Sequence, residues 1–123
     1  MKRPVNILVD SDKSLDDLVE EMRSVLGFDF QRVIDQGRIY YKFCGPNVFV
    51  YVDRNDYEND GKINFQDYIY DIEVEVFNIY DLEEREQYAR EVGWFIFEKL
   101  RETQSYRLML VRQSTDQVGR VHP

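Results

Sequence analysis

Residues 68–77 alternate between apolar and acidic side chains, and this pattern constrains the fold more than any other feature of the sequence. The acidic positions are Asp71, Glu73 and Glu75, and the apolar positions are Tyr68, Tyr70, Ile72, Val74 and Val76. Successive side chains of a β-strand point to opposite faces of the sheet, so a period of two predicts a strand with one buried and one solvated face. The solvated face of this strand is acidic.

Two segments show the three-to-four-residue apolar spacing of amphipathic helices. The first begins at Ser14, a favourable N-cap residue, and ends at Gly27, a typical C-terminal stop. The second begins at Asp81, and its predicted apolar stripe consists of Leu82, Ala89, Val92, Phe95, Ile96 and Leu100. Trp94 and Phe97 lie at a flank of this stripe, where they either widen the core contact or form an exposed anchor for a partner.

Four further strands are predicted, over residues 5–9, 38–44, 48–54 and 106–111. The second and third of these form a hairpin, because Gly45-Pro46-Asn47 between them is a strong turn signal. The segment 28–37 is ambiguous: it forms a short strand, or it is a loop whose Phe28 and Phe30 enter the core. Residues 114–123 are predicted to form a polar tail.

The resulting order of elements is β-α-β-β-β-α-β, and a chain of this length fits a single domain, over residues 1–113. Two helices packed on one face of a mostly antiparallel sheet satisfy this order with short connections, so we predict an α+β fold. A ferredoxin-like arrangement with an extra strand is the topology that we expect.

Acidic residues are concentrated in one half of the chain. The net charge is −8, and residues 53–91 alone contain thirteen acidic and four basic side chains. Such a surface repels phosphate backbones and attracts cationic partners, so nucleic-acid binding is disfavoured. No apolar stretch approaches the roughly 20 residues of a membrane-spanning helix, and no signal-peptide pattern is visible. We therefore expect a cytoplasmic protein that does not associate with membranes.

The segment 56–67 resembles the calcium-binding loop of the EF-hand family. The resemblance places the side-chain ligands at Asp56, Glu58, Asp60, Asn64 and Asp67. It departs from the family pattern because Glu58 is longer than the usual third ligand and Asp67 replaces a bidentate Glu. The flanking segments are also predicted strands, whereas an EF-hand loop joins two helices. We therefore interpret this segment as a solvated hairpin loop without a metal or cofactor, with calcium binding as the alternative.

The sequence contains no recognisable catalytic constellation. The single histidine, His122, lies in the predicted tail and is poorly placed for a general base. The single cysteine, Cys44, ends a predicted strand without a neighbouring histidine, so we interpret it as a buried or half-buried structural thiol. The glycines are scattered and form no phosphate-binding loop. We predict that the chain is not an enzyme, and an enzyme that uses carboxylates alone is the remaining alternative.

Size, charge and aromatic content together indicate a protein-binding module. The expected partner-binding residues are Asp71, Glu73 and Glu75 on the acidic strand, Asp53, Asp56, Glu58 and Asp60 in and before the acidic loop, and Trp94 and Phe97 on the second helix. In these features the chain resembles the small acidic immunity proteins of bacterial toxin systems. That resemblance implies a cationic protein partner, often a nuclease, which the chain neutralises. A calcium- or small-ligand-binding regulatory domain centred on 56–67 is the alternative function.

Overall fold

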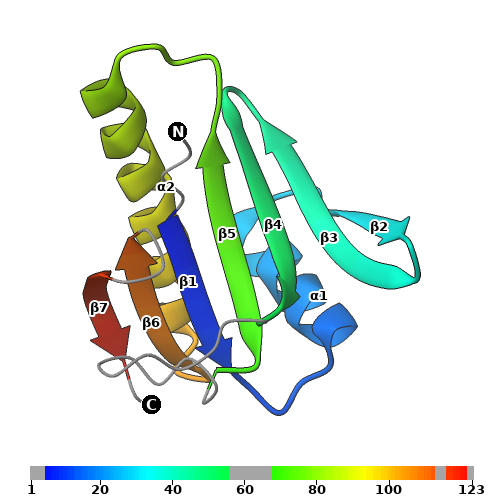
Figure 1. The fold of residues 1–123 in the computed structure, drawn as a ribbon. Coiled ribbons are helices and arrows are strands. Elements are labelled where there is room, and N and C mark those ends of the chain that lie inside the picture. Colours follow the sequence, from blue (N-terminus) through cyan, green and yellow to red (C-terminus); the bar gives the residue numbers. More distant parts are fainter. Residues whose placement is uncertain (1–4, 56–67, 113–115, 122–123) are drawn as a thin grey trace.

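One antiparallel sheet forms a layer of the structure, and two helices cover one of its faces (Figure 1). The structure is a computed structural model that describes residues 5–55, 68–112 and 116–121. Within these residues the sheet has seven strands in the order β2-β3-β4-β5-β1-β6-β7, and all neighbours are antiparallel. The strands are β1 (Val5–Asp10), β2 (Gln31–Asp35), β3 (Arg38–Gly45), β4 (Val48–Arg54), β5 (Tyr70–Val76), β6 (Arg107–Arg112) and β7 (Asp116–Val121). The helices are α1 (Leu15–Leu26) and α2 (Leu82–Glu102).

The predicted α+β class, with two helices on one face of an antiparallel sheet, is confirmed. The observed order contains two strands more than the predicted one, β2 and β7. Strand β1 lies between β5 and β6, so it is an interior strand of the sheet. The finer expectation of a ferredoxin-like arrangement stays a prediction.

The predicted alternation is confirmed along β5. Tyr70, Ile72 and Val74 are buried in the core beneath the helices, so the acidic residues between them lie on the opposite, helix-free face. The alternation fails at Tyr68, which precedes the strand and is buried in a second, smaller cluster with Leu8, Met109 and Val111. These three partners belong to β1 and β6, where they alternate with residues of the main core. The helix-free face therefore has a small apolar cluster of its own.

Helix α1 has the ends that its sequence predicts. The Ser14 hydroxyl accepts a hydrogen bond from the backbone N–H of Asp17 at 3.1 Å. Gly27 adopts a left-handed conformation with φ of 70°, and its N–H donates to the Arg23 carbonyl at 3.0 Å. Only glycine takes this conformation without strain, which explains why the helix stops there.

Helix α2 begins at Asp81 as predicted, but the face that it buries differs from the predicted stripe. The buried residues are Ala89, Gly93, Ile96, Phe97 and Leu100, whereas Phe95 and Leu82 are exposed. Gly93 explains the shift, because a Cβ atom at this position would lie 2.7 Å from Cγ1 of Val5 on β1. The absence of a side chain lets α2 approach the sheet with Gly93 at the centre of the contact.

The ambiguous segment 28–37 combines both of its predicted alternatives. Phe30 is buried and Phe28 packs against the core, as in the loop interpretation. The next five residues form β2, which pairs with β3 through a turn in which Gln36 and Gly37 both have positive φ. Two consecutive positive φ values are typical of the tight turns that join hairpin strands.

The prediction of a polar tail over 114–123 is wrong for residues 116–121. These residues form β7, which pairs with β6 through an irregularity between Leu110 and Val111. Strands pair through hydrogen bonds between backbone N–H and C=O groups. The edge of β6 presents a row of these groups, with which another strand can form hydrogen bonds. A segment without an apolar pattern can therefore extend the sheet.

Candidate functional site

The helix-free side of β3, β4 and β5 combines a row of aromatic rings with a row of carboxylates. We call this surface the aromatic–acidic face and define it by Tyr40, Phe49, Tyr51, Phe77, Asp53, Asp71, Glu73 and Glu75. The strand register pairs Phe49 with Glu75 and, two residues further along, Tyr51 with Glu73. Asp53 pairs in the same way with Asp71. All eight side chains belong to residues of intermediate exposure, so the face is open to contact.

The four rings of this face form a continuous row. The centroids of Tyr40 and Tyr51 are 6.2 Å apart, and those of Tyr51 and Phe49 are 6.1 Å apart. Phe77, directly after β5, stacks on Phe49 with a centroid distance of 4.4 Å. These separations are close to the range of about 4.5–7 Å in which aromatic pairs attract one another. The rings therefore hold each other in place and form one continuous aromatic surface, in which Phe49 and Phe77 are stacked and the other neighbouring rings are tilted.

The four carboxylates lie in different surroundings. Asp53 forms an ion pair with Arg38 at 2.6 Å, and Asp71 accepts a hydrogen bond from the side-chain amide of Asn6 at 2.9 Å. Glu73 and Glu75 lie beside Tyr51, where burial and then the charges of these two carboxylates raise the pKa of the phenol. The negative potential of the acidic row therefore acts directly on the aromatic row.

The structure brings some of the predicted partner-binding residues together. Asp53, Asp71, Glu73 and Glu75 all belong to the aromatic–acidic face. The predicted residues Asp56, Glu58 and Asp60, and the alternative calcium ligands Asn64 and Asp67, lie outside the described residues. Among the residues that are described, no group of three Asp, Glu, His or Cys side chains lies close enough to hold a metal ion.

Trp94 and Phe97 serve the core, which is the first of their two predicted alternatives. Phe97 is buried, and Trp94 meets its ring edge-on at a centroid distance of 5.2 Å while packing against the main core. Phe95 has the opposite outcome. It was predicted to be buried and is 44% exposed. Trp94 and Phe97 therefore do not form an exposed anchor for a partner.

Cys44 is exposed, so the interpretation as a buried or half-buried thiol is wrong. It lies near the end of β3, on the helix-free face, and pairs with Phe49 of β4. Its position follows from the alternation of β3, in which Tyr41 and Phe43 take the core-facing positions.

Sequence reasoning missed Phe49, Phe77 and the nearby Lys42 as site residues. A signal for Phe49 was present, because the residues Val48–Asp53 alternate between valine and a larger or charged side chain. The valines are buried in the core, so the alternate positions must lie on the helix-free face. The position of Lys42 beside the rings depends on the register of β3 with β4, which the predicted hairpin does not specify.

Among the described residues, two hollows border the helices. One is an apolar pocket of about 320 Å³ between α2 and the β3–β4 turn, with walls from Phe28, Phe43 and Phe95. Among the described residues, its polar side chains are Tyr88 and Glu91, and the Tyr88 hydroxyl donates to the Pro46 carbonyl at 3.0 Å. A binding site for a small substrate usually has several polar groups that converge on the ligand. This pocket lacks that arrangement.

The second hollow has a volume of about 620 Å³ and lies between the start of α1 and the β2–β3 turn. Three of its charged side chains contact other protein groups. Arg38 pairs with Asp53, and Asp16 accepts a hydrogen bond from the Tyr41 hydroxyl. The hollow is therefore lined by side chains that stabilise the fold.

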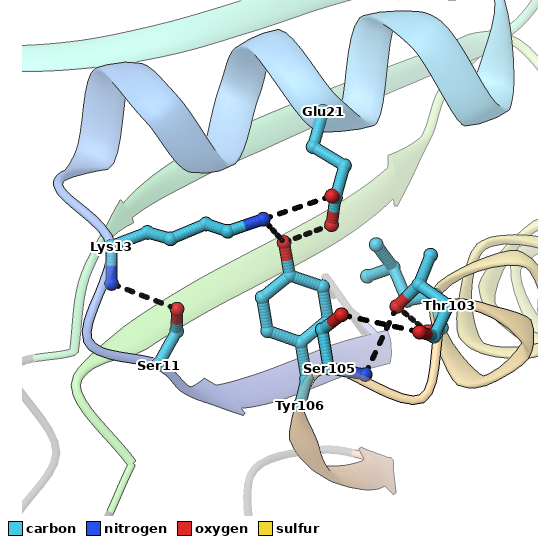
Figure 2. A network of polar contacts seen from close by, with 7 residues as sticks. Ser11, Lys13, Glu21, Thr103, Ser105 and Tyr106 are labelled. Carbon is cyan, nitrogen blue, oxygen red and sulfur yellow. Dashed lines mark hydrogen bonds and ion pairs between the residues drawn. The ribbon is translucent and has the colours of Figure 1, made fainter.

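A polar network centred on Lys13, Glu21 and Tyr106 lies on the helix side of the sheet (Figure 2). The Lys13 ammonium donates to Glu21 of α1 at 2.8 Å and to the hydroxyl of Tyr106 at 3.1 Å. The Tyr106 hydroxyl in turn donates to Glu21, and the backbone carbonyl of Lys13 accepts a hydrogen bond from Tyr70 at 2.5 Å. The network therefore fastens the β1–α1 connection to α1, to β5 and to the residue before β6.

The protonation states of this network fit a structural role. Burial, and then the hydrogen bond to Glu21, raises the pKa of Tyr106 to about 12. A phenol with such a pKa stays neutral and is a poor nucleophile or base near neutral pH. Burial raises the pKa of Glu21, but the hydrogen bonds from Lys13 and Tyr106 outweigh burial, and the pKa is lowered overall. Glu21 therefore stays ionised.

Comparisons with protein-family models, with curated proteins and with solved structures find no match to this chain. In the part of the chain that the structure describes, neither helix is long and apolar enough to cross a membrane.

Proposed function

We propose that this chain is a protein-binding module that docks a cationic partner protein on the aromatic–acidic face, and that it neutralises a cationic toxin as an immunity protein does. The observation that carries the proposal is the register of β4 with β5, which places Phe49 beside Glu75 and Tyr51 beside Glu73. Aromatic side chains are enriched at protein interfaces, and carboxylates at the rim attract a basic partner and orient it. This face supplies both chemistries side by side.

The charge of the whole chain supports the same partner class. A net charge of −8 produces a long-range field that accelerates the approach of a basic protein. A nuclease toxin carries basic residues where it binds phosphates, so an acidic surface can cover that region and compete with nucleic acid. The immunity role rests on this complementarity and on the resemblance in size, charge and aromatic content.

The shape of the molecule favours surface binding over small-molecule chemistry. The apolar pocket beside Phe95 has few polar side chains, and in the larger hollow Arg38 pairs with Asp53 while Asp16 accepts a hydrogen bond from Tyr41. The aromatic–acidic face, in contrast, spans three neighbouring strands and resembles the mixed aromatic and polar surface of a transient interface.

The experiment compares two double variants with equal loss of charge. Glu73→Gln with Glu75→Gln neutralises the proposed face, and Glu83→Gln with Glu84→Gln neutralises the exposed first turn of α2. Each variant and the wild type are used to capture partners from a lysate of the native host. We expect a basic protein that the wild type and the α2 variant retain and the face variant loses.

The captured protein is then purified, and its association rate with each variant is measured at low and high ionic strength. The face variant should associate more slowly and with less salt dependence than the α2 variant. Expression of the captured protein in bacteria should arrest growth, and co-expression of the wild-type chain should restore it. Equal association rates for both variants, or growth arrest that the chain does not relieve, would contradict the proposal.

A further inference from the structure

The aromatic–acidic face already has a cation bound to its rings. Lys42 of β3 is the register partner of Tyr51, and its ammonium nitrogen lies 4.2 Å from the ring centroid of Phe49. The same nitrogen lies 5.6 Å from the ring centroid of Tyr51. Both distances are within the roughly 6 Å over which a cation is attracted to the negative face of an aromatic ring.

Two carboxylates on the neighbouring strand β5 strengthen the attraction of the rings for a positive charge. Glu75 is the register partner of Phe49, and Glu73 is the register partner of Tyr51. The rings therefore supply two π faces, and β5 supplies two negative charges beside them. Among the described residues, Lys42 forms no ion pair within 4.0 Å, so its contact with this surface is through the rings. Within the described part of the chain, a rearrangement of Lys42 would break no salt bridge.

We propose that the rings of Phe49 and Tyr51 are the binding site for one lysine or arginine side chain of the partner, and that Lys42 occupies this site in the free protein until the partner displaces it. This inference rests on the proposed function, because it names the group that the aromatic–acidic face recognises. The site takes an ammonium or guanidinium group, since both can lie over an aromatic ring with their charge directed to carboxylates.

Competition by Lys42 makes the face selective. A partner that offers a single basic side chain must displace a cation that is already attached to the protein, so its affinity is reduced. A partner with several basic residues also gains contacts with the rest of the acidic row, and these contacts offset the displacement. Lys42 therefore disfavours weak cationic ligands more than the proper partner.

The test uses a hexaarginine peptide as the probe and isothermal titration calorimetry at low ionic strength. Lys42→Met removes the competing ammonium. Lys99→Met is the matched control, because Lys99 also lies over a ring, 5.8 Å from the centroid of Phe95 on α2, but in the helix layer. Relative to Lys99→Met, the Lys42→Met variant should bind the peptide about 2- to 5-fold more tightly, the equivalent of one cation–π contact.

A second pair of variants separates the ring contact from simple charge repulsion. In a Phe49→Leu background, Lys42→Met should no longer increase the affinity, and Tyr51→Leu provides the same comparison if Phe49→Leu does not fold. Equal affinities for Lys42→Met and Lys99→Met would overturn the inference. The inference would also be overturned if Lys42→Met increased the peptide affinity as much in the Phe49→Leu background as it does in the otherwise wild-type protein.

The same titrations distinguish failure of this inference from failure of the proposed function. If Glu73→Gln with Glu75→Gln weakens peptide binding and Lys42→Met matches its control, the face binds cations but Lys42 does not compete. If the face variant binds like Glu83→Gln with Glu84→Gln, or if the wild type does not bind the peptide, the proposed function and this inference both fail.

Discussion

Asn6 of β1 donates a hydrogen bond of 2.9 Å from its side-chain amide to the carboxylate of Asp71 on β5. Asn6 is fully buried, and among the described residues it is the one non-aromatic polar side chain with no exposure. Buried polar groups are costly unless they are hydrogen-bonded. Asp71 therefore contributes to folding as well as to the charge of the aromatic–acidic face.

Asp71→Ala should lower the free energy of unfolding by about 1–2 kcal/mol, because it removes an acceptor for the buried amide of Asn6. Asp71→Asn keeps a carbonyl oxygen in the same place and should cost less. Urea denaturation measures both changes. Glu73→Gln with Glu75→Gln is the control and should leave stability unchanged or raise it by a few tenths of a kcal/mol, since like charges on one strand face repel. An Asp71→Ala variant as stable as the wild type would contradict this role.

Gly93→Ala should destabilise the protein, although alanine is the better helix former. The gain in helix propensity is about 1 kcal/mol. The new methyl group would lie 2.7 Å from Cγ1 of Val5, on a strand that is held between β5 and β6, and such overpacking costs about 1–3 kcal/mol. We expect a lower melting temperature by thermal denaturation. Val5→Ala in the same chain should recover part of the loss, and a melting temperature above that of the wild type would refute the close contact.

Stability should fall between about pH 10 and 12, in part through Tyr106. The ordinary pKa of a tyrosine is 10.0, and that of Tyr106 in the folded protein is about 12. A raised pKa stabilises the fold below the unfolded-state value, and this contribution is lost as the pH rises through the folded-state value. Tyr106→Phe removes the contribution, so its unfolding free energy should depend less on pH over this range. The raised pKa values of Lys13, Tyr41 and Tyr51 act in the same direction, so the difference between variant and wild type is the relevant quantity.

The acid side of the stability curve should depend on Glu21. Its pKa in the fold is lowered from the ordinary value of 4.5, so its contribution is present above about pH 4.5 and is lost as the pH falls through the folded-state value. Glu21→Gln should reduce stability at pH 7 and should also reduce the further loss on acidification. Guanidinium denaturation at a series of pH values measures this. Parallel pH profiles for wild type and variant would show that Glu21 does not take part.

Deletion of residues 114–123 should destabilise the domain, because it removes β7 and leaves the outer edge of β6 without a strand partner. We expect a loss of more than about 1 kcal/mol in the free energy of unfolding, since several backbone hydrogen bonds disappear together. The truncated protein should also show a greater tendency to associate in sedimentation experiments. An unchanged unfolding free energy would mean that the pairing of β7 with β6 adds no stability.

The elements that the sequence predicts correctly are those whose local pattern and tertiary environment agree. The acidic and apolar alternation of β5 and the capped ends of α1 are examples, because each depends on residues close together in the chain. The face of α2 was predicted only in part. Ala89, Ile96 and Leu100 are buried as predicted, but the pattern of large apolar residues also favoured Phe95, which is exposed, and the contact is centred on Gly93. A glycine is not counted in a pattern of large apolar residues, but its lack of a side chain determines how closely the helix approaches the sheet.

The candidate site was predicted only in its acidic half. Carboxylates at every second position are visible in the sequence, whereas the aromatic row depends on which strands become neighbours. Lys42 reaches Phe49 because β3 pairs with β4 in one particular register, and Phe77 stacks on Phe49 because β4 also pairs with β5. The composition predicted a surface rich in acidic and aromatic residues, but the pairing of the strands determines which rings and charges lie next to one another.

The interior position of β1 has a consequence for how the chain reaches its native state. Val5 pairs with Val74 on one side and with Arg112 on the other, so the complete pairing of β1 needs two strands that are distant from it in the sequence. The β3–β4 hairpin, in contrast, closes between residues that are only a few positions apart. Folding rates fall as the sequence separation of contacting residues grows. The hairpin that carries Lys42, Phe49 and Tyr51 should therefore form early, and the pairing of β1 with β6 should follow only after α2 and β6 have been synthesised.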